Sequence, residues 1–386
     1  MKYLIFTSFI LLFIFNSCFC QTKPVVVFSS KSEGYKSYRI PAIINLQNGD
    51  LLAFAEGRVH HAGDFGDVNI VMKKSKDKGK TWSPILSVVD YDSLQAGNPA
   101  PVVDISDPLY PNGRIFLFYN TGNNHEGEVR KGKGYREVWY KTSIDGGNTW
   151  SDAVNITTQV HRPNQPQINP AYNFKEDWRS YANTPGHAMQ FERGKYKGRI
   201  FVAANHSEGN PKPQFTDYYA HGFFTDDHGK TFQLSDNVNL PGSNESTAAP
   251  LYNGGLIMNS RNQDGEVKAR IVSISSNGGA SWDTTYFDFQ LPDPVNEGSI
   301  LPIRLRKKSA ILAFCNAASK IIRDSLTLRI SFNAGRTWKK EWLIDASGKS
   351  DNTAYSDLVL INKKKIGILY EKENYSRIVF TTIRWK

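Results

Sequence analysis

Three arginines of this sequence are candidates for binding an anionic ligand. They lie within Ser37–Pro41 (Ser-Tyr-Arg-Ile-Pro), Met258–Asn262 (Met-Asn-Ser-Arg-Asn) and Ile321–Ser325 (Ile-Ile-Arg-Asp-Ser), each next to an apolar run or a probable strand. A guanidinium can grip a carboxylate through charge-assisted, partly bidentate hydrogen bonds. A surface ion pair is nevertheless the ordinary role of any single arginine. The three arginines become a candidate binding site only if the fold brings them together.

A polar, glycine-containing segment offers candidate acids. It reads Arg58-Val-His-His-Ala-Gly-Asp-Phe-Gly-Asp67, and its composition predicts a loop over the mouth of a pocket. Asp64 and Asp67 compete as the group that would exchange a proton, although the ordinary role of either is to form a turn. The pair His60–His61 has no further ligands at a recognisable spacing, so we expect no metal there.

A recurring octapeptide indicates which elements must position these residues. Its five copies begin at residues 75, 143, 225, 275 and 331 and fit the pattern S/T-x-D/N-x-G-x-S/T-W/F. Asp or Asn followed two residues later by Gly favours a hairpin turn, which the terminal aromatic ring can cover. The last two copies carry Asn instead of Asp, which a turn tolerates and a catalytic acid would not. The repeat is therefore interpreted as structural.

The repeats predict a single all-β domain. Irregular spacing of a constant motif suggests one four-stranded unit with variable loops, and a propeller blade has a period of roughly 40–50 residues. About six such blades would use the chain. We therefore predict a six-bladed β-propeller of four-stranded antiparallel blades over residues 21–386. Because the inner strands of a propeller converge on one axis, arginines far apart in the sequence could meet there.

The first twenty residues resemble a secretory signal. Lys2 precedes the apolar run Tyr3–Phe15, which is too short for a confident membrane span. Cleavage could precede Gln21, or it could precede Cys18 and leave a lipid-anchored protein. We expect an exported protein that is periplasmic, secreted or lipid-anchored at the cell surface. Cys315 alone certainly remains in the mature chain, so no disulfide framework is available.

The chain is basic, with a formal net charge of +10 at pH 7. Such a charge can favour nucleic acids, membranes or anionic ligands. The lysines are scattered along the sequence, which is typical of a solvated surface. Because no nucleic-acid motif or phosphate loop is present and the protein is expected to be exported, we expect no nucleic-acid partner.

Taken together, these landmarks resemble the bacterial exo-α-sialidases, or neuraminidases, whose Asp-box (BNR) repeats match the octapeptide. The resemblance begins at the Arg-Ile-Pro motif and covers roughly residues 25–385. Asp boxes also occur in propellers that are not enzymes, whereas the whole ordered set of landmarks is specific. The further landmarks, in the family's order, are Asn98–Asp104, Pro185–His187, Asn244–Ser246, Asn259–Arg261, Ala354–Asp357 and Ile368–Glu371.

The resemblance implies a set of residues that bind the acidic sugar. Three guanidiniums would grip its carboxylate, one acidic residue would fix the first of them, and two further residues would contact the sugar. In that order these are Arg39, Arg261 and Arg323; Glu371; and Arg58 and Asp104. Asp104 would contact sugar hydroxyls or the acyl-amino group. No metal and no organic cofactor is implied.

The resemblance also implies three catalytic residues. A carboxylate nucleophile would be repelled by the negative charge on the anomeric carbon, and sialidases use a neutral tyrosine instead. Tyr355 matches this nucleophile, and Glu245 matches the base that takes its proton. The family places its acid/base Asp eleven positions before the first Asp-box serine, which selects Asp64 over Asp67.

We therefore predict an exo-α-sialidase that hydrolyses terminal α-linked sialic acids on glycoproteins, glycolipids and oligosaccharides. The reaction would retain configuration through a tyrosyl-enzyme intermediate. Two alternatives stay open. A propeller could bind sialylated glycans without cleaving them, although this would require a lost catalytic residue. A trans-sialidase or intramolecular trans-sialidase would use the same catalytic set and differ in how water is excluded.

Overall fold

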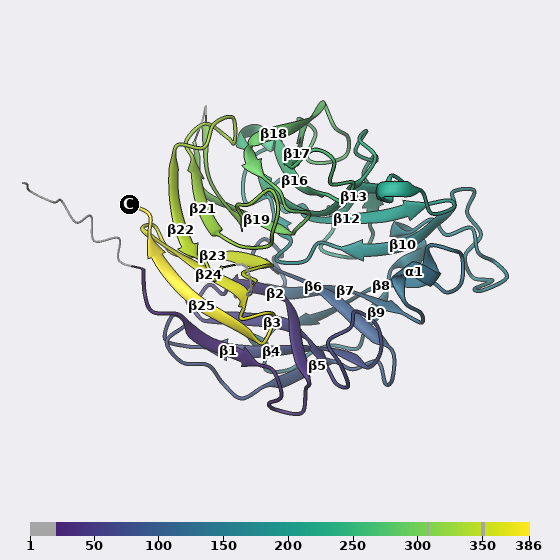
Figure 1. Cartoon of the computed structure of the whole chain (residues 1–386), viewed down its shortest axis with the longest axis horizontal. Coiled ribbons are helices and arrows are strands. Elements are labelled where there is room, and N and C mark those ends of the chain that lie inside the picture. Colours follow the sequence, from purple (N-terminus) through teal and green to yellow (C-terminus); the bar gives the residue numbers. More distant parts are fainter. Residues whose placement is uncertain (1–20, 307–308, 349–351) are drawn as a thin grey trace, which may run out of the picture.

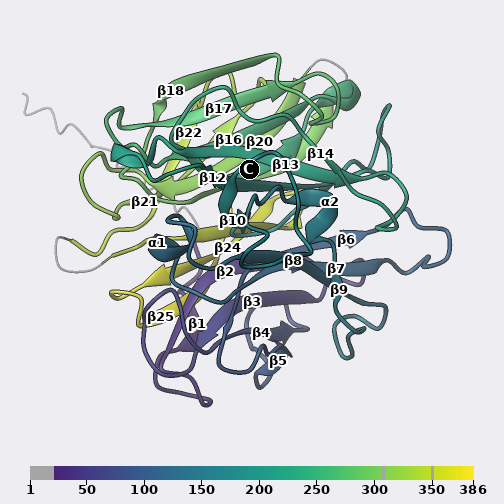
Figure 2. The same cartoon turned by 90° about the vertical axis from the view of Figure 1, so that its right-hand side faces the viewer.

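The computed structural model of this chain describes residues 21–306, 309–348 and 352–386. Sheets surround a central axis (Figure 1), so the predicted all-β propeller is confirmed. The two α-helices, α1 (Glu126–Val129) and α2 (Thr157–Val160), are short pieces beside the strands (Figure 2), and Pro213–Phe215 and Tyr252–Gly254 form 3-10 turns. No helix in these ranges is long and apolar enough to cross a bilayer. The expected signal, residues 1–20, lies outside the described residues.

Four sheets have the size of one blade, and they contain the following strands in the order of their pairing. The first contains β1 (Val25–Ser29), β25 (Arg377–Arg384), β24 (Lys365–Lys372) and β23 (Ser356–Asn362). The second contains β10 (Trp178–Asn183), β12 (Ile200–Glu208), β13 (Tyr218–Thr225) and β14 (Gln233–Leu234), with β11 (Met189–Gln190) also on β12. The third contains β15 (Ser243–Pro250), β16 (Leu256–Asn262), β17 (Ala269–Ser275) and β18 (Thr284–Pro292). The fourth contains β19 (Gly298–Arg306), β20 (Ser309–Ala317), β21 (Leu326–Ser331) and β22 (Lys340–Asp345).

The remaining sheet has eight strands, which differs from the prediction of separate four-stranded blades. It contains β2 (Ser37–Asn45), β3 (Leu51–Arg58), β4 (Val68–Ser75), β5 (Leu86–Val89), β6 (Gln95–Asp104), β7 (Arg114–Gly122), β8 (Arg136–Ser143) and β9 (Val154–Asn155). Its β4 and β6 are joined by one parallel pair, Val68 with Gln95. Hydrogen bonding thus divides the described strands into five sheets, four of them blade-sized, and not into the six blades expected. One bridge is enough to merge two sets of strands, and no sequence pattern reports it.

The two ends of the described chain close the ring. The purple strand β1 lies against the yellow strand β25 (Figure 1), with Val25 opposite Phe380. Upstream of β1, the amide of Thr22 donates to the carbonyl of Thr382 at 2.9 Å. Both ends of the described chain therefore belong to one sheet.

The five octapeptides form nearly identical turns. In the first, Ser75 Oγ donates to Asp77 Oδ1 and accepts from the amide of Gly79, both at 2.8 Å, while Asp77 also accepts from Thr81. The corresponding glycines of all five turns have φ between +84° and +88°, a left-handed conformation that favours glycine. The terminal aromatic of each turn packs on another ring, with centroids 5.6 to 6.4 Å apart. The turns therefore join strands and fill the core.

Candidate functional site

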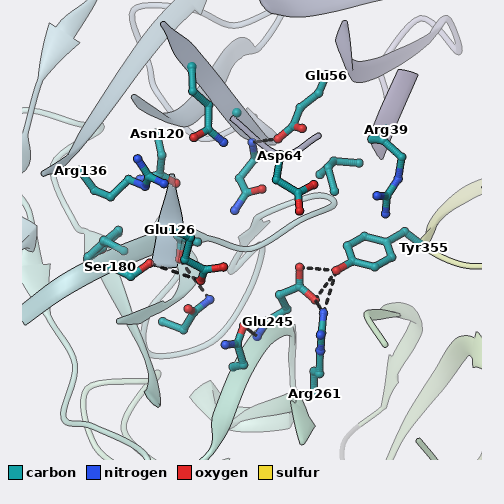
Figure 3. A pocket seen from close by; sticks show the side chains of 18 of the residues that line it. Arg39, Glu56, Asp64, Asn120, Glu126, Arg136, Ser180, Glu245, Arg261 and Tyr355 are labelled. Carbon is teal, nitrogen blue, oxygen red and sulfur yellow. Dashed lines mark hydrogen bonds and ion pairs between the residues drawn. The ribbon is translucent and has the colours of Figure 1, made fainter. Parts of the chain in front are cut away.

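A polar cavity of about 220 Å³ collects most of the predicted site residues (Figure 3). All five octapeptides lie within the described residues, and none of their side chains lines this cavity. The predicted residues that line it are Arg39, Arg58, Asp64, Glu245, Arg261, Arg323 and Tyr355. They come from two sheets and three loops: Arg39 and Arg58 lie on the eight-stranded sheet, Glu245 and Arg261 lie on the sheet β15–β18, and the other three lie in loops beside strand ends.

At the centre of the cavity, Tyr355 and Glu245 form a short hydrogen-bonded pair (Figure 3). The phenol Oη lies 2.6 and 2.7 Å from the two carboxylate oxygens of Glu245, and Arg261 Nη1 donates to both groups at 2.6 and 2.8 Å. Burial, reinforced by the charge of Glu245, holds the pKa of Tyr355 well above its usual value, although the nearby guanidiniums oppose this. The tyrosine is therefore neutral, with a carboxylate placed to accept its proton.

The position of Glu245 depends on an irregular strand. The pairing of β15 with β16 shifts between Ser243 and Ser246, so Glu245 leaves the regular ladder and its side chain enters the cavity. Bulges of this kind re-aim side chains next to active sites. The same irregularity occurs in β2, where the register shifts between Arg39 and Ala42.

Arg39 is held by a buried carboxylate behind the cavity wall. Its Nε lies 2.7 Å from Glu371 Oε1 and its Nη2 lies 3.2 Å from Oε2. Burial alone would lower the pKa of Arg39, but Glu371 raises it on balance, so the guanidinium stays charged. Glu371 also accepts from the amides of Ile40 (2.9 Å) and Tyr355 (3.3 Å). The amide contact anchors Ile40 at φ 59°, a strained conformation for a β-branched residue.

Arg323 completes a group of three guanidiniums. Its Nη2 donates to the carbonyl of Val295 at 3.1 Å, and its Nη1 lies 3.5 Å from the hydroxyl of Tyr375. Within the described ranges no carboxylate comes within ion-pair distance of Arg323. Its positive charge is therefore uncompensated. Together with Arg39 and Arg261, it makes this side of the cavity suitable for an anion.

Asp64 lies at the mouth of the cavity on the predicted loop. Its Oδ1 is 2.9 Å from Arg58 Nη1, and its side chain is 73% exposed whereas that of Arg58 is 2% exposed. Partial desolvation favours the neutral acid, but Arg58 and Arg39 outweigh it and lower the pKa of Asp64. Asp67 instead lies 3.7 Å from His60 and does not line the cavity. The structure therefore places Asp64 at the pocket, and not its competitor.

The structure does not place Asp104 at the pocket. This residue is buried, and its carboxylate binds Gln190 (2.6 Å), the amide of Ser106 (3.0 Å) and His228 (2.7 Å). The cavity is lined by Gln95 at the opposite end of the same strand. A β-strand rises about 3.3 Å per residue, so Asp104 lies far outside hydrogen-bonding reach of the cavity. The sequence motif correctly indicates a strand at Asp104. It does not indicate which end of that strand lies at the cavity.

One cluster could in principle hold a cation. The carboxylates of Asp104 and Asp107 and the ring of His228 offer ligand atoms within 4.8 Å of one another. Both carboxylates, however, already have protein partners, because Asp104 binds His228 and Asp107 lies 3.0 Å from Arg114. The cluster is an internal ion-pair network outside the cavity.

Sequence reasoning missed the far wall of the cavity, opposite the three arginines. Arg136, Glu126 and Ser180 line it, and no motif had marked them. Glu126 lies on α1 beside β10 (Figures 1 and 2) and accepts from Ser180 Oγ at 3.4 Å (Figure 3). Arg136 lies so close to Gly122 that a Cβ there would be 1.8 Å from its Nη1. A glycine directly across from an arginine on paired strands was the one available signal, and it is visible only once the register is known.

The chain is similar to known proteins over most of its length. The family described as "BNR repeat-like domain" matches residues 25–368. A sialidase of Micromonospora viridifaciens is 29% identical over 375 residues, covering 92% of this chain and 52% of the relative, so the chain spans about half of that protein. An exo-alpha-sialidase of Aspergillus fumigatus is 28% identical over 377 residues, covering 89% of this chain and 80% of the relative. The solved Hadza microbial sialidase Hz136 has the same fold, with a TM-score of 0.77 and 23% identity over 94% of this chain and 68% of its own.

Proposed function

Because the chain belongs to the bacterial sialidase family with BNR repeats, we propose that it is an exo-α-sialidase. It hydrolyses terminal α-linked sialic acids of glycoproteins, glycolipids and oligosaccharides. The observation that carries this proposal is the pair Tyr355–Glu245 beside three guanidiniums. A neutral nucleophile next to a carboxylate-binding site suits a sugar that carries its negative charge on the reacting carbon.

The three guanidiniums bind the substrate carboxylate. Arg39 and Arg261 line the cavity on the side of Tyr355 (Figure 3), and the guanidinium carbon of Arg323, which also lines the cavity, lies 5.9 Å from the centre of the Tyr355 ring. The carboxylate supplies the negative charge that no described carboxylate gives to Arg323, while Glu371 keeps Arg39 in place before substrate arrives. This arrangement fixes the anomeric carbon next to the phenol oxygen, so that positioning is completed before the reaction begins.

In the first step, Tyr355 Oη forms a bond to the anomeric carbon as the bond to the leaving oxygen breaks. Glu245 takes the phenol proton, and Asp64 gives a proton to the leaving oxygen. In the second step, water gives a proton to Asp64 and attacks the same carbon. The bond to Tyr355 breaks, and the phenolate recovers its proton from Glu245. Two displacements on one carbon retain its configuration.

The contact between Asp64 and Arg58 explains how the acid is controlled. In the free protein Arg58 keeps Asp64 ionised, which an acid must not be at the moment of proton transfer. Sugar hydroxyls that accept hydrogen bonds from Arg58 compete with Asp64 for its N–H groups, and the sugar ring removes water from around Asp64. Both changes raise the pKa of the carboxyl towards the operating pH.

The decisive experiment is Tyr355→Phe assayed with an aryl sialoside. The substitution removes the nucleophilic oxygen, and we expect kcat to fall by about 10³-fold or more while the fold is kept. Tyr286→Phe, a half-exposed tyrosine on β18, is the matched control and should keep full activity. Wild-type turnover by the Tyr355 variant would refute the nucleophile.

Product analysis separates hydrolysis from transfer. Proton NMR of the wild-type reaction should show free sialic acid released first as the α-anomer, because configuration is retained. A 2,7-anhydro product or a sugar transferred to an acceptor would support the trans-sialidase alternatives instead. Bound sialoside without any product would support a binding propeller.

We also propose that the propeller has six blades. The eight-stranded sheet would act as two antiparallel units, β2–β5 and β6–β9, because a single parallel pair, Val68 with Gln95, joins them. Each unit then matches the other sheets in size. Replacing Val68 by Pro would remove the amide of residue 68, and it should leave the activity largely intact if the bridge is incidental.

A further inference from the structure

One end of the sheet β1–β25–β24–β23 is strongly cationic: the end at which β1 and β24 start and β23 and β25 finish. We call this end of the strands the cationic edge. The turn between β23 and β24 holds Lys363 and Lys364, and β24 begins with Lys365. Lys23 precedes β1, and Arg384 and Lys386 lie at and after the end of β25. All six side chains are exposed. They are far apart in the sequence, where they looked scattered, and the pairing of β1 with β25 and of β24 with β23 gathers them.

The first octapeptide turn extends this cationic edge. Lys78 and Lys80 are exposed on either side of Gly79, which packs so tightly that a Cβ would lie 2.0 Å from the ring of Phe380 on β25. A cleft of about 290 Å³ lies between the turn and the sheet, and it is lined by lysines 23, 78, 80 and 365 without any carboxylate. Within the described ion pairs, none of these four lysines has an acidic partner.

The cationic edge and the active-site pocket lie at opposite ends of the same strands. Strand β23 starts directly after Tyr355 and ends at Asn362, while β24 runs from Lys365 back to Glu371 and Lys372. At about 3.3 Å per residue, these strands separate the two sites by roughly 20 Å. Whatever lies against the cationic edge therefore leaves the pocket open on the other side.

The chain upstream of the propeller leaves from this edge. The side chain and amide of Thr22 bond to Thr381 and Thr382 at the end of β25. Cleavage before Cys18, one of the two sites that the sequence offers, would leave a lipid-anchored residue four positions before Thr22. A polybasic surface beside such an anchor strengthens attachment to anionic lipids.

We propose that the cationic edge docks on an anionic phospholipid surface, with the pocket facing away from it. The lysines are exposed and spread over a wide edge, which suits a diffuse surface charge better than one discrete anion. The ring of Phe380, which lines the cleft, and that of Trp385, between Arg384 and Lys386, are buried and offer no face on which a sugar could stack. The proposal does not depend on the proposed activity, because it concerns the opposite end of the strands.

The test is sedimentation of the protein with lipid vesicles. The chain from Gln21 to Lys386, which contains every described strand, is mixed with vesicles of phosphatidylcholine alone or with added phosphatidylglycerol. We expect binding to the anionic vesicles, release as the salt concentration rises, and little binding to the neutral ones. Equal binding to both kinds of vesicle would overturn the proposal.

Two matched variants, each with five lysines replaced by glutamine, locate the binding face. The first changes the cationic edge at Lys78, Lys80, Lys363, Lys364 and Lys365; the second changes exposed lysines elsewhere, at Lys175, Lys195, Lys197, Lys212 and Lys230. We expect the first to lower the partition coefficient on anionic vesicles by roughly 100-fold or more and the second to change it little. Equal losses would show that only net charge matters, which would contradict a dedicated edge.

Two further readouts keep the test clear. Turnover of a soluble aryl sialoside should be unchanged in both variants, since neither touches the cavity, and this also shows that the fold is intact. Heparin is offered in competition with the vesicles as a soluble polyanion. If it binds the cationic edge more tightly than the vesicles do at equal charge, the surface belongs to an anionic polysaccharide and the membrane proposal is wrong.

Discussion

The five octapeptide turns and the catalytic cavity use similar polar side chains in opposite ways. In the first turn, every bond of Asp77 joins residues at most four positions apart. In the cavity, Tyr355 and Glu245 are 110 positions apart, and Arg39 and Glu371 are 332 apart. The structure of the turn is therefore determined by its own eight residues. The cavity exists only when distant strands hold their register.

The two regions also differ in what they leave unsatisfied. Bonds from Thr81 and Ser75 lower the pKa of Asp77 to about 2, although the group is at the surface, and they close the network. In the cavity, burial and Glu245 raise the pKa of Tyr355, and Arg323 lacks an acidic partner in the described ranges. The closed network serves the fold, whereas the open one is ready for a substrate.

The strongest test of this contrast is Glu371→Ala. It leaves Arg39 buried without its carboxylate and releases the amides of Ile40 and Tyr355. We expect a loss of about 3–5 kcal/mol in the free energy of unfolding. We also expect kcat/KM to fall by roughly 10³-fold, because a binding guanidinium and the nucleophile both lose their support.

Urea unfolding and kinetics with an aryl sialoside measure the two effects of Glu371→Ala. Glu341→Ala is the control, because Glu341 pairs with Arg329 at 3.0 Å but is 64% exposed. The control should cost less than about 1 kcal/mol and leave kinetics unchanged. Similar results for the two variants would remove the distinction between cavity support and surface pairing.

Acid should weaken the long-range region more than the turns. His161, His206 and His221 are buried against one another and Trp178, behind the cavity residue Tyr181. Burial lowers the pKa of His221 to about 3 and holds those of the other two well below their usual value. The folded state thus keeps them neutral, while the unfolded chain takes up protons below about pH 6.5.

Because only the unfolded chain takes up these protons, acid lowers the free energy of unfolding. Stability is full above the unfolded pKa and falls as the pH drops below it, by roughly 3 kcal/mol at about pH 4 for His221 alone. Thermal unfolding at two pH values should show this loss, and His221→Asn should reduce it. His60→Asn, at a ring that is 71% exposed, should not. A loss that His221→Asn leaves unchanged would assign the acid sensitivity to other groups.

The sequence could predict what is local. The turns, their glycines and the covering aromatics follow from eight residues, and the family resemblance supplied the residues around Tyr355. The far wall could not be found, because Arg136 meets the cavity only through the pairing of β7 with β8. Asp104 was misplaced for a related reason: it stands at the end of β6 opposite Gln95, and only the folded arrangement shows that the Gln95 end lies at the cavity.

Removing the central residue of one turn should affect only stability. Asp77→Ala deletes the acceptor of bonds from Ser75, Lys80 and Thr81. We expect a loss of about 2 kcal/mol, since a turn residue that satisfies several donors resembles a helix cap in its energetics. kcat and KM should stay at their wild-type values. A tenfold fall in kcat would mean that this turn communicates with the cavity.

The smallest expected effect is that of Asp77→Asn. The fourth and fifth turns already use Asn277 and Asn333, whose Oδ1 atoms accept from Ser281 and Thr337 as Asp77 accepts from Thr81. The amide nitrogen of Asn277 also donates to the hydroxyl of its partner, which reverses one bond without losing it. We therefore expect a change below about 0.5 kcal/mol near pH 7. The variant should also lose less stability than wild type below about pH 4, because there the carboxylate of the unfolded chain takes up a proton while the folded one, with a pKa of about 2, still resists it, and the amide does not titrate. Urea unfolding near pH 7 and near pH 3 tests both expectations. An Asn variant as unstable as Asp77→Ala would show that the charge of Asp77, and not its hydrogen-bond geometry, stabilises the turn.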